Sequence, residues 1–254
     1  MVVGIAVIVI AVPVILLLIR KPQDKNLLPY GMTESFGQDE QQAVLEEKGL
    51  TLSAARKTSG FYALIVFFFL ITSFGSFVMH IPASVHSLSF VSELSSPTTF
   101  AGTIMSIYLI GALVGAIMFG FLSDKIGAKN TAILAMIIGI VTIVLLLFLA
   151  ETQAILMVAF FLFGIVTSSI GTLGPVLTSS LFGNKEYSQI FSNASLGLAI
   201  AGIVSLPIYG FIFDLSGSYT GALYAILIML VIAIVCIFIA FKSKAQTVKD
   251  GLWN

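Results

Sequence analysis

The chain alternates long apolar runs with short polar connections, a pattern that predicts membrane-spanning helices. Runs without a charged residue occupy 1–19, 60–79, 98–121, 130–149, 153–180, 188–212 and 219–241. About twenty helical residues cross a hydrocarbon core roughly 30 Å thick, and an α-helix satisfies its own backbone hydrogen bonds there. The sequence therefore predicts an all-α polytopic membrane protein with seven transmembrane helices.

Composition and charge support this class of protein. Charged residues make up 9% of the chain and hydrophobic residues 58%, whereas soluble domains carry about 25% charged residues. The formal net charge is zero, which argues against nucleic acid as a partner. The lipid bilayer is the expected surrounding. The single cysteine, Cys236, lies in an apolar run, where packing is its expected role.

The basic residues predict an orientation. The run at 1–19 has no positive charge before it and ends at Arg20, so we interpret it as a transmembrane helix rather than a secretory signal. With seven spans, all 12 Lys and Arg residues fall on one side of the membrane, which the positive-inside rule makes the cytoplasm. We expect a multi-pass plasma (inner) membrane protein with a cytoplasmic connector at 20–58 and a cytoplasmic tail at 243–254.

The last six predicted spans divide into two triplets of opposite topology. Spans two to four begin inside and end outside, and spans five to seven do the reverse. Inverted three-helix repeats are common in secondary transporters. Any six consecutive spans divide in this way, so topology alone does not identify the architecture.

The connection between the third and fourth spans carries the most informative motif. It is short and polar, and it contains Gly120, Asp124, Lys125, Gly127 and Lys129. We expect Gly120 to let two helices approach closely, Gly127 to permit a tight turn, and Asp124 to lie near the positive end of the following helix.

The motif Gly-x-x-x-Asp-Lys-x-Gly-x-Lys at 120–129 resembles the signature loop of the major facilitator superfamily. The resemblance implies a conformational latch, in which contacts of Asp124 and the basic residues form in one state and break in the other. Ala128 departs from the family pattern, which often has Arg or Lys there. A well-capped cytoplasmic loop is the alternative interpretation.

Four further segments are similar to the oxalate/formate antiporter and monocarboxylate transporter group of that superfamily. They are Arg20-Lys21-Pro22 with Leu27-Leu28-Pro29-Tyr30-Gly31, His80-Ile81-Pro82-Ala83, Phe182 to Ser188, and Asp214 to Tyr219. The resemblance implies that 1–19 corresponds to helix six, 20–58 to the central loop, and 59–242 to the six-helix C-terminal half of a twelve-helix carrier. A half lacks a complete substrate path, so we expect a truncated chain or one that pairs with an N-terminal half or a second copy.

Polar residues within the spans are candidates for the substrate path. We select Tyr108, Asn193, Thr72 and Ser168. Each has a structural alternative: aromatic packing for Tyr108, interhelical hydrogen bonding for Asn193, and bonding within its own helix for Thr72 and Ser168. No Lys, Arg, Asp or Glu lies well inside a span, which favours a monocarboxylate over oxalate, unless the other half supplies the charge.

The remaining chemistry-bearing residues predict little. His80 and His86 are expected to be solvated loop residues at the outer surface. Catalytic motifs, phosphate-binding loops and clusters of metal ligands are absent from the sequence, so we predict no enzyme and no cofactor. The leading hypothesis is a proton- or anion-coupled secondary carrier of a small organic anion, such as an antiporter. The alternative is a truncated, non-transporting membrane subunit or relic.

Overall fold

The computed structural model describes residues 12–13 and 48–253. The predicted span at 1–19 and most of the connector lie outside the described residues. Between 48 and 253 the chain forms helices and one isolated bridge, Gly49 with Gly183. The helices are α3 (Leu52–Ala55), α4 (Ser59–Ser76), η2 (Phe77–His80), α5 (Ile81–His86), α6 (Ser89–Ser92), α7 (Pro97–Phe148), α8 (Gln153–Phe182), α9 (Tyr187–Ala194), α10 (Leu196–Ser216) and α11 (Thr220–Lys249).

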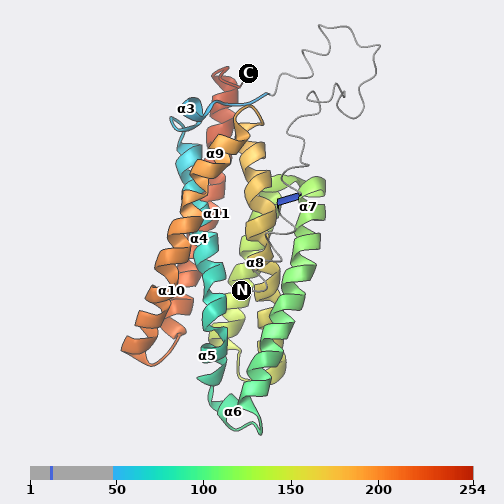
Figure 1. Ribbon diagram of the computed structural model, residues 1–254, viewed down its shortest axis with the longest axis vertical. Helices are drawn as coiled ribbons and strands as arrows, with labels where there is room; N and C mark the ends of the chain where they lie inside the picture. Colours follow the sequence, from blue (N-terminus) through green and yellow to red (C-terminus); the bar gives the residue numbers. More distant parts are fainter. Residues whose placement is uncertain (1–11, 14–47, 254) are drawn as a thin grey trace. The chain divides into compact units, whose positions relative to one another are not determined.

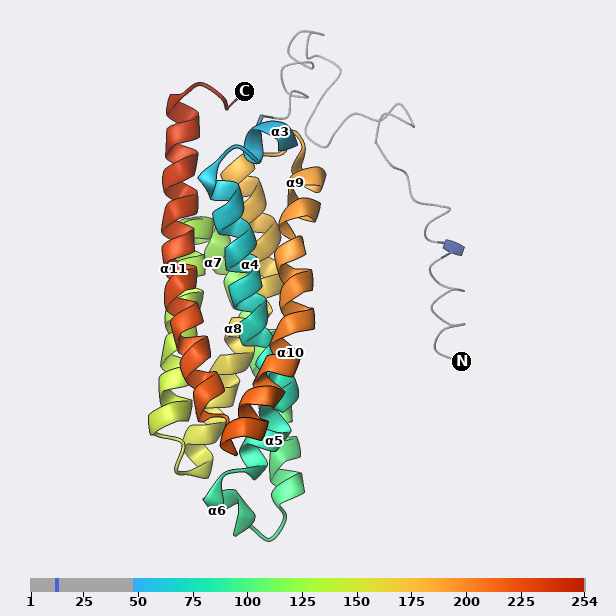
Figure 2. The same cartoon turned by 90° about the vertical axis from the view of Figure 1, so that its left-hand side faces the viewer.

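The long helix α7 consists of two helices joined at Gly127. The backbone of Gly127 has φ 80° and ψ 157°, which interrupts the helix, and the chain reverses direction there (Figures 1 and 2). Five of the described helices are long and apolar enough to cross a membrane, namely Ser59–His86, Pro97–Phe148, Gln153–Phe182, Tyr187–Ser216 and Thr220–Lys249. Because the break at Gly127 divides Pro97–Phe148 into two helices, they form six segments. These segments confirm the all-α polytopic class and match the six spans predicted between 60 and 241.

The helix boundaries have local causes. Thr58 caps α4 and Thr152 caps α8, because each side chain accepts a hydrogen bond from the backbone N–H three residues later. Pro97 begins α7, where a proline ring suits the first helical turn. Gly217 ends α10 in the left-handed conformation, at φ 67°.

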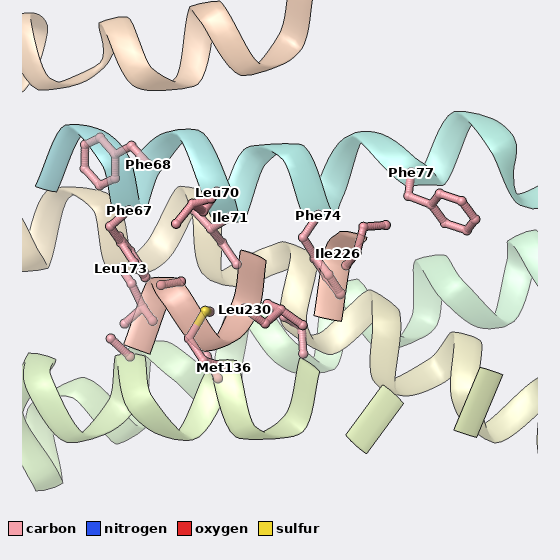
Figure 3. Packing of buried hydrophobic residues seen from close by; sticks show 14 of the residues in the cluster. Phe67, Phe68, Leu70, Ile71, Phe74, Phe77, Met136, Leu173, Ile226 and Leu230 are labelled. Carbon is pink, nitrogen blue, oxygen red and sulfur yellow. The ribbon is translucent and has the colours of Figure 1, made fainter. Parts of the chain in front are cut away.

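Helix α4 lies at the centre of the bundle and contacts α8, α10 and α11. Its buried side chains pack against those of the neighbouring helices, as Figure 3 shows for Ile71, Phe74, Met136, Leu173 and Leu230. Large apolar side chains on the other faces are exposed, for example Ile117 at 70% and Ile203 at 75%. In a bilayer these faces contact lipid or another membrane-embedded partner.

The helices α7 and α8 pack with their backbones in close contact. A Cβ atom added to Gly164 of α8 would collide with the carbonyl oxygen of Tyr108 and lie 2.8 Å from the nitrogen of Ala112. Gly111 of α7 meets the backbone of Phe161 in the same way. Glycine at these positions lets the two backbones touch.

The two ends of the bundle differ in charge. Helix α3, the start of α9 and the end of α11 lie together at one end, while α5 and α6 lie at the other (Figures 1 and 2). The end with α3 carries Lys48, Arg56, Lys57, Lys185 and Lys249. These five basic residues therefore lie at one end of the bundle, in agreement with the prediction that the basic residues lie on one side of the membrane.

Candidate functional site

The turn at Gly127 is confirmed as the break between two spans. Its positive φ of 80° is a conformation that glycine adopts without steric cost. The hydroxyl of Thr131 donates to the carbonyl oxygen of Gly127 at 2.9 Å, and Asn130 Nδ2 donates to Ile126 O at 3.1 Å. Ala128 is 6% exposed, so a small side chain fits this position.

The charged residues of the turn differ in their surroundings. Lys125 Nζ lies 4.4 Å from the ring centre of Phe121, and Lys129 Nζ lies 5.0 Å from that of Phe238 on α11. Such cation–π contacts hold the two ammonium groups near their helices. Asp124 is exposed, and within residues 48–253 its carboxylate has no hydrogen-bond partner. The carboxylate is therefore open to a partner outside the described residues.

Among the described residues, Gly120 does not lie at a close contact between helices. A Cβ atom added there would have no heavy atom within 4 Å, so no described helix approaches closely. Among the described helices, close approaches occur at Gly111, Gly115, Gly164 and Gly197 instead. Spacing within the signature motif did not reveal this, because helix contact depends on which face each helix turns towards its neighbour.

Tyr108 lies at the contact of α7 with α8. Its hydroxyl oxygen lies 3.3 Å from Thr167 Oγ1, which donates its own proton to Gly164 O at 2.8 Å, and its ring lies 6.0 Å from that of Phe163. The side chain is half-buried. Sequence reasoning missed Thr167, although it lies beside the selected Ser168, because the pairing depends on the register between two helices.

Thr72 and its neighbour Ser73 face different surroundings on α4. The Oγ1 of Thr72 is buried without a hydrogen-bond partner among the described residues. Ser73 Oγ accepts from Ser205 Oγ at 2.8 Å, and its carbonyl oxygen accepts from the Tyr209 hydroxyl at 2.8 Å. An unpaired buried oxygen is costly and rare, so Thr72 has unused capacity to bind a polar group.

Ser168 and Asn193 have partners that support the structural alternatives. Ser168 Oγ donates to Ile165 O at 2.7 Å and faces Gly115 of α7. Asn193 Oδ1 accepts from Arg56 Nη2 at 2.6 Å. Asn193 thus bonds to the residue that follows α3, near the end of the bundle, whereas we expected it at membrane depth. The structure brings Tyr108 and Thr167 together but gives no contact between Asn193 and the other selected residues.

The last residues of the connector, 48–58, form a strap against the turn between α8 and α9. Leu50 N donates to Phe182 O at 2.8 Å and Asn184 N donates to Lys48 O at 3.0 Å. Leu52 N donates to the Glu186 carboxylate at 2.7 Å. Only short residues fit where the two segments cross, since a Cβ on Gly183 would lie 2.5 Å from the Cα of Gly49.

His80 is not a solvated loop residue, contrary to expectation. Its Nδ1 lies 3.2 Å from the Tyr219 hydroxyl and its Nε2 lies 3.2 Å from Leu206 O. Because a carbonyl only accepts, Nε2 donates to Leu206 O, and Nδ1 pairs with the Tyr219 hydroxyl. His86 is exposed, as expected.

The described residues thus form a bundle of apolar helices with a polar turn at Gly127 and hydroxyl groups between the helices. A family model described as the Major Facilitator Superfamily matches residues 84–251. The chain therefore belongs to the major facilitator superfamily, whose members move small solutes across membranes.

Individual relatives match parts of the chain. The sialic acid transporter NanX of Escherichia coli is 29% identical over 52% of this chain and 31% of its own length. The MFS-type transporter hasB of Aspergillus fumigatus is 32% identical over 64% of this chain and 36% of its own length. Monocarboxylate transporter 12 of Mus musculus is 30% identical over 48% of this chain and 26% of its own length. The chain spans about a quarter to a third of the length of these curated relatives.

Proposed function

We propose that this chain is the C-terminal half of a secondary carrier that moves a small organic anion, and a monocarboxylate in particular, by alternating access. The complete carrier is this chain together with an N-terminal six-helix half, or with a second copy. The proposal rests on the order along the chain of the segments that are similar to the oxalate/formate antiporter and monocarboxylate transporter group. It rests also on the turn between two spans that resembles the signature loop of the superfamily. A relative named for monocarboxylates and another named for sialic acid support an acidic solute.

The proposed orientation places the strap, the Gly127 turn and the end of α11 in the cytoplasm, in a plasma (inner) membrane. The one-sided basic residues support this assignment through the positive-inside rule. The proposed latch consists of Gly120, Asp124, Lys125, Gly127 and Lys129. The exposed carboxylate of Asp124 supports it, because a latch needs a group that is free to bind the other half.

The proposed substrate path runs along the hydroxyl groups of α4, α7 and α8. Thr72 supports it through its unpaired oxygen, and Tyr108 and Thr167 support it through a long bond that a solute could replace. Ser168 remains a candidate beside them. Neutral hydroxyls can orient a carboxylate by hydrogen bonding but cannot balance its charge, so the counter-charge is expected from the other half.

Uptake by proteoliposomes tests the function. We expect the complete carrier to take up labelled lactate or formate in a saturable way, with weak competition by oxalate. Absence of saturable uptake by a folded, correctly inserted complete carrier would contradict the organic-anion assignment. If no second half exists and the chain alone is inert, the non-transporting subunit or relic is the better conclusion.

The substrate path has a sharper test in Tyr108→Phe. Loss of this hydroxyl removes one donor and acceptor from the path. Because one hydrogen bond contributes about 1 kcal/mol, we expect KM to rise about fivefold while membrane insertion is unchanged. Tyr224→Phe is the matched control, because Tyr224 is 46% exposed on α11. Equal KM values for the two variants would remove Tyr108 from the path.

A further inference from the structure

A second candidate site lies at the end of the bundle, between the strap and α11. It is a cavity of about 740 Å³. Its described lining combines two ammonium groups, several hydroxyls and exposed apolar side chains. These residues include Lys57, Ser59, Ile239, Lys242, Ser243 and Leu252.

The strap and the start of α4 build one wall of this cavity. Leu52 N donates to the Glu186 carboxylate, and Gly60 N donates to Ser243 Oγ at 3.0 Å, which joins the start of α4 to α11. These bonds hold Lys57 on one wall while Lys242 lies on the other. The cavity is thus made by packing of defined elements.

The charges of the lining favour an anion. Lys57 and Lys242 contribute two positive charges, whereas Asp250 contributes one negative charge. The Asp250 carboxylate accepts a hydrogen bond from Gln246 Nε2 at 3.0 Å. The described lining therefore has a net positive charge, with ammonium and hydroxyl donors suited to phosphate oxygens.

The depth of the cavity identifies the chemical class of the ligand. The apolar run of α11 ends at Phe241 and is followed by Lys242, while α4 becomes apolar from Gly60 onwards. The cavity lies at this boundary, which is the level of lipid headgroups. Ile239 and Leu252 are 43% and 56% exposed there, so an apolar surface adjoins the two lysines. A phospholipid presents the same combination of phosphate and acyl chain.

We propose that the cavity between the strap and α11 binds the phosphate of an anionic phospholipid, with the adjoining acyl chain against Ile239 and Leu252. This site is separate from the solute path and depends only on the chain's residence in a membrane. The lipid holds Lys57 and Lys242 together and so fastens the strap to α11.

The fluorescence of Trp253 measures the binding of lipid to this cavity. Trp253 is the only tryptophan of the chain, it follows Leu252 of the lining, and its ring lies 4.8 Å from Lys244 Nζ. The full chain is reconstituted in phosphatidylcholine containing brominated phosphatidylglycerol or, at equal mole fraction, brominated phosphatidylcholine. We expect stronger quenching of Trp253 by the anionic lipid. In Lys57→Gln/Lys242→Gln this preference should fall about 25-fold, about fivefold for each lysine.

The control Lys125→Gln/Lys185→Gln removes the same charge elsewhere at this end of the bundle, and its preference should stay at the wild-type value. Equal quenching by the two lipids, or an equal loss in both double variants, would overturn the proposal. Millimolar inorganic phosphate should leave the preference unchanged. If it abolishes the preference, the site takes soluble phosphate and the lipid assignment is wrong. Transport activity does not enter any of these outcomes, so they are independent of the proposed carrier function.

Discussion

Replacement of Gly164 by alanine tests whether the backbone contact between α7 and α8 holds the bundle together. Two opposing effects decide the result. Alanine favours a helix interior by about 1 kcal/mol relative to glycine. Its Cβ, however, would collide with Tyr108 O and lie 2.8 Å from Ala112 N, whereas ordinary contacts begin at 3.4 Å.

The collision cannot be relieved by a side-chain rotation, because both neighbouring atoms belong to the backbone. The two helices must separate along this contact until Tyr108 O clears the new Cβ, and overpacking of this kind costs about 1–3 kcal/mol or more. After the gain of about 1 kcal/mol in helix propensity, we therefore expect Gly164→Ala to destabilise the bundle by up to about 2 kcal/mol.

The assay is unfolding of the purified chain in mixed micelles, followed by circular dichroism as the SDS fraction rises. Gly202→Ala is the matched control, since a Cβ there meets no heavy atom within 4 Å. That variant should be as stable as the original chain or up to about 1 kcal/mol more stable. If both variants unfold at the same SDS fraction, the close contact of α7 with α8 does not exist as described.

Three further substitutions have expected outcomes. Gly183→Ala should release the strap and speed trypsin cleavage at its basic residues, because its Cβ would lie 2.5 Å from the Cα of Gly49, whereas Gly217→Ala, which has open space, should not. His80→Ala should cost about 1–2 kcal/mol in the same unfolding assay by removing two hydrogen bonds, while the exposed His86→Ala should stay within about 0.5 kcal/mol. Asp124→Asn should slow transport by the complete carrier without affecting insertion, and unchanged rates would remove Asp124 from the latch.

Much of the helical architecture follows from sequence because its causes are local. The apolar runs between 60 and 241 are helices, and Gly127 was correctly predicted as the turn that divides α7, since only the turn residue needs a positive φ. The caps Thr58 and Thr152 belong to the same class of local signal.

Contacts between distant segments could not be predicted in this way. Gly120 belongs to the motif but faces open space, whereas Gly164 makes the close contact. His80 was expected in solvent, yet Tyr219 and the backbone of Leu206 bind it. Which glycine or histidine meets a partner depends on helix rotation and register, and a single sequence contains neither.

The strap is the clearest feature that sequence reasoning missed. Its contacts join residues more than a hundred positions apart, such as Leu52 with Glu186. The available signal was a pair of glycines, Gly49 and Gly183, each in a polar segment beside an apolar run. Glycine in such a position is also ordinary turn chemistry, so the pairing became visible only in three dimensions.

Solute counterflow tests the central proposal most directly. Proteoliposomes that contain the complete carrier are loaded with unlabelled lactate and diluted into a trace of labelled lactate. A carrier that exposes one site alternately to each side should accumulate label transiently above the equilibrium level, and lactate-free vesicles should not. Absence of this overshoot with a folded complete carrier, for lactate and for formate, would contradict an alternating-access carrier of monocarboxylates.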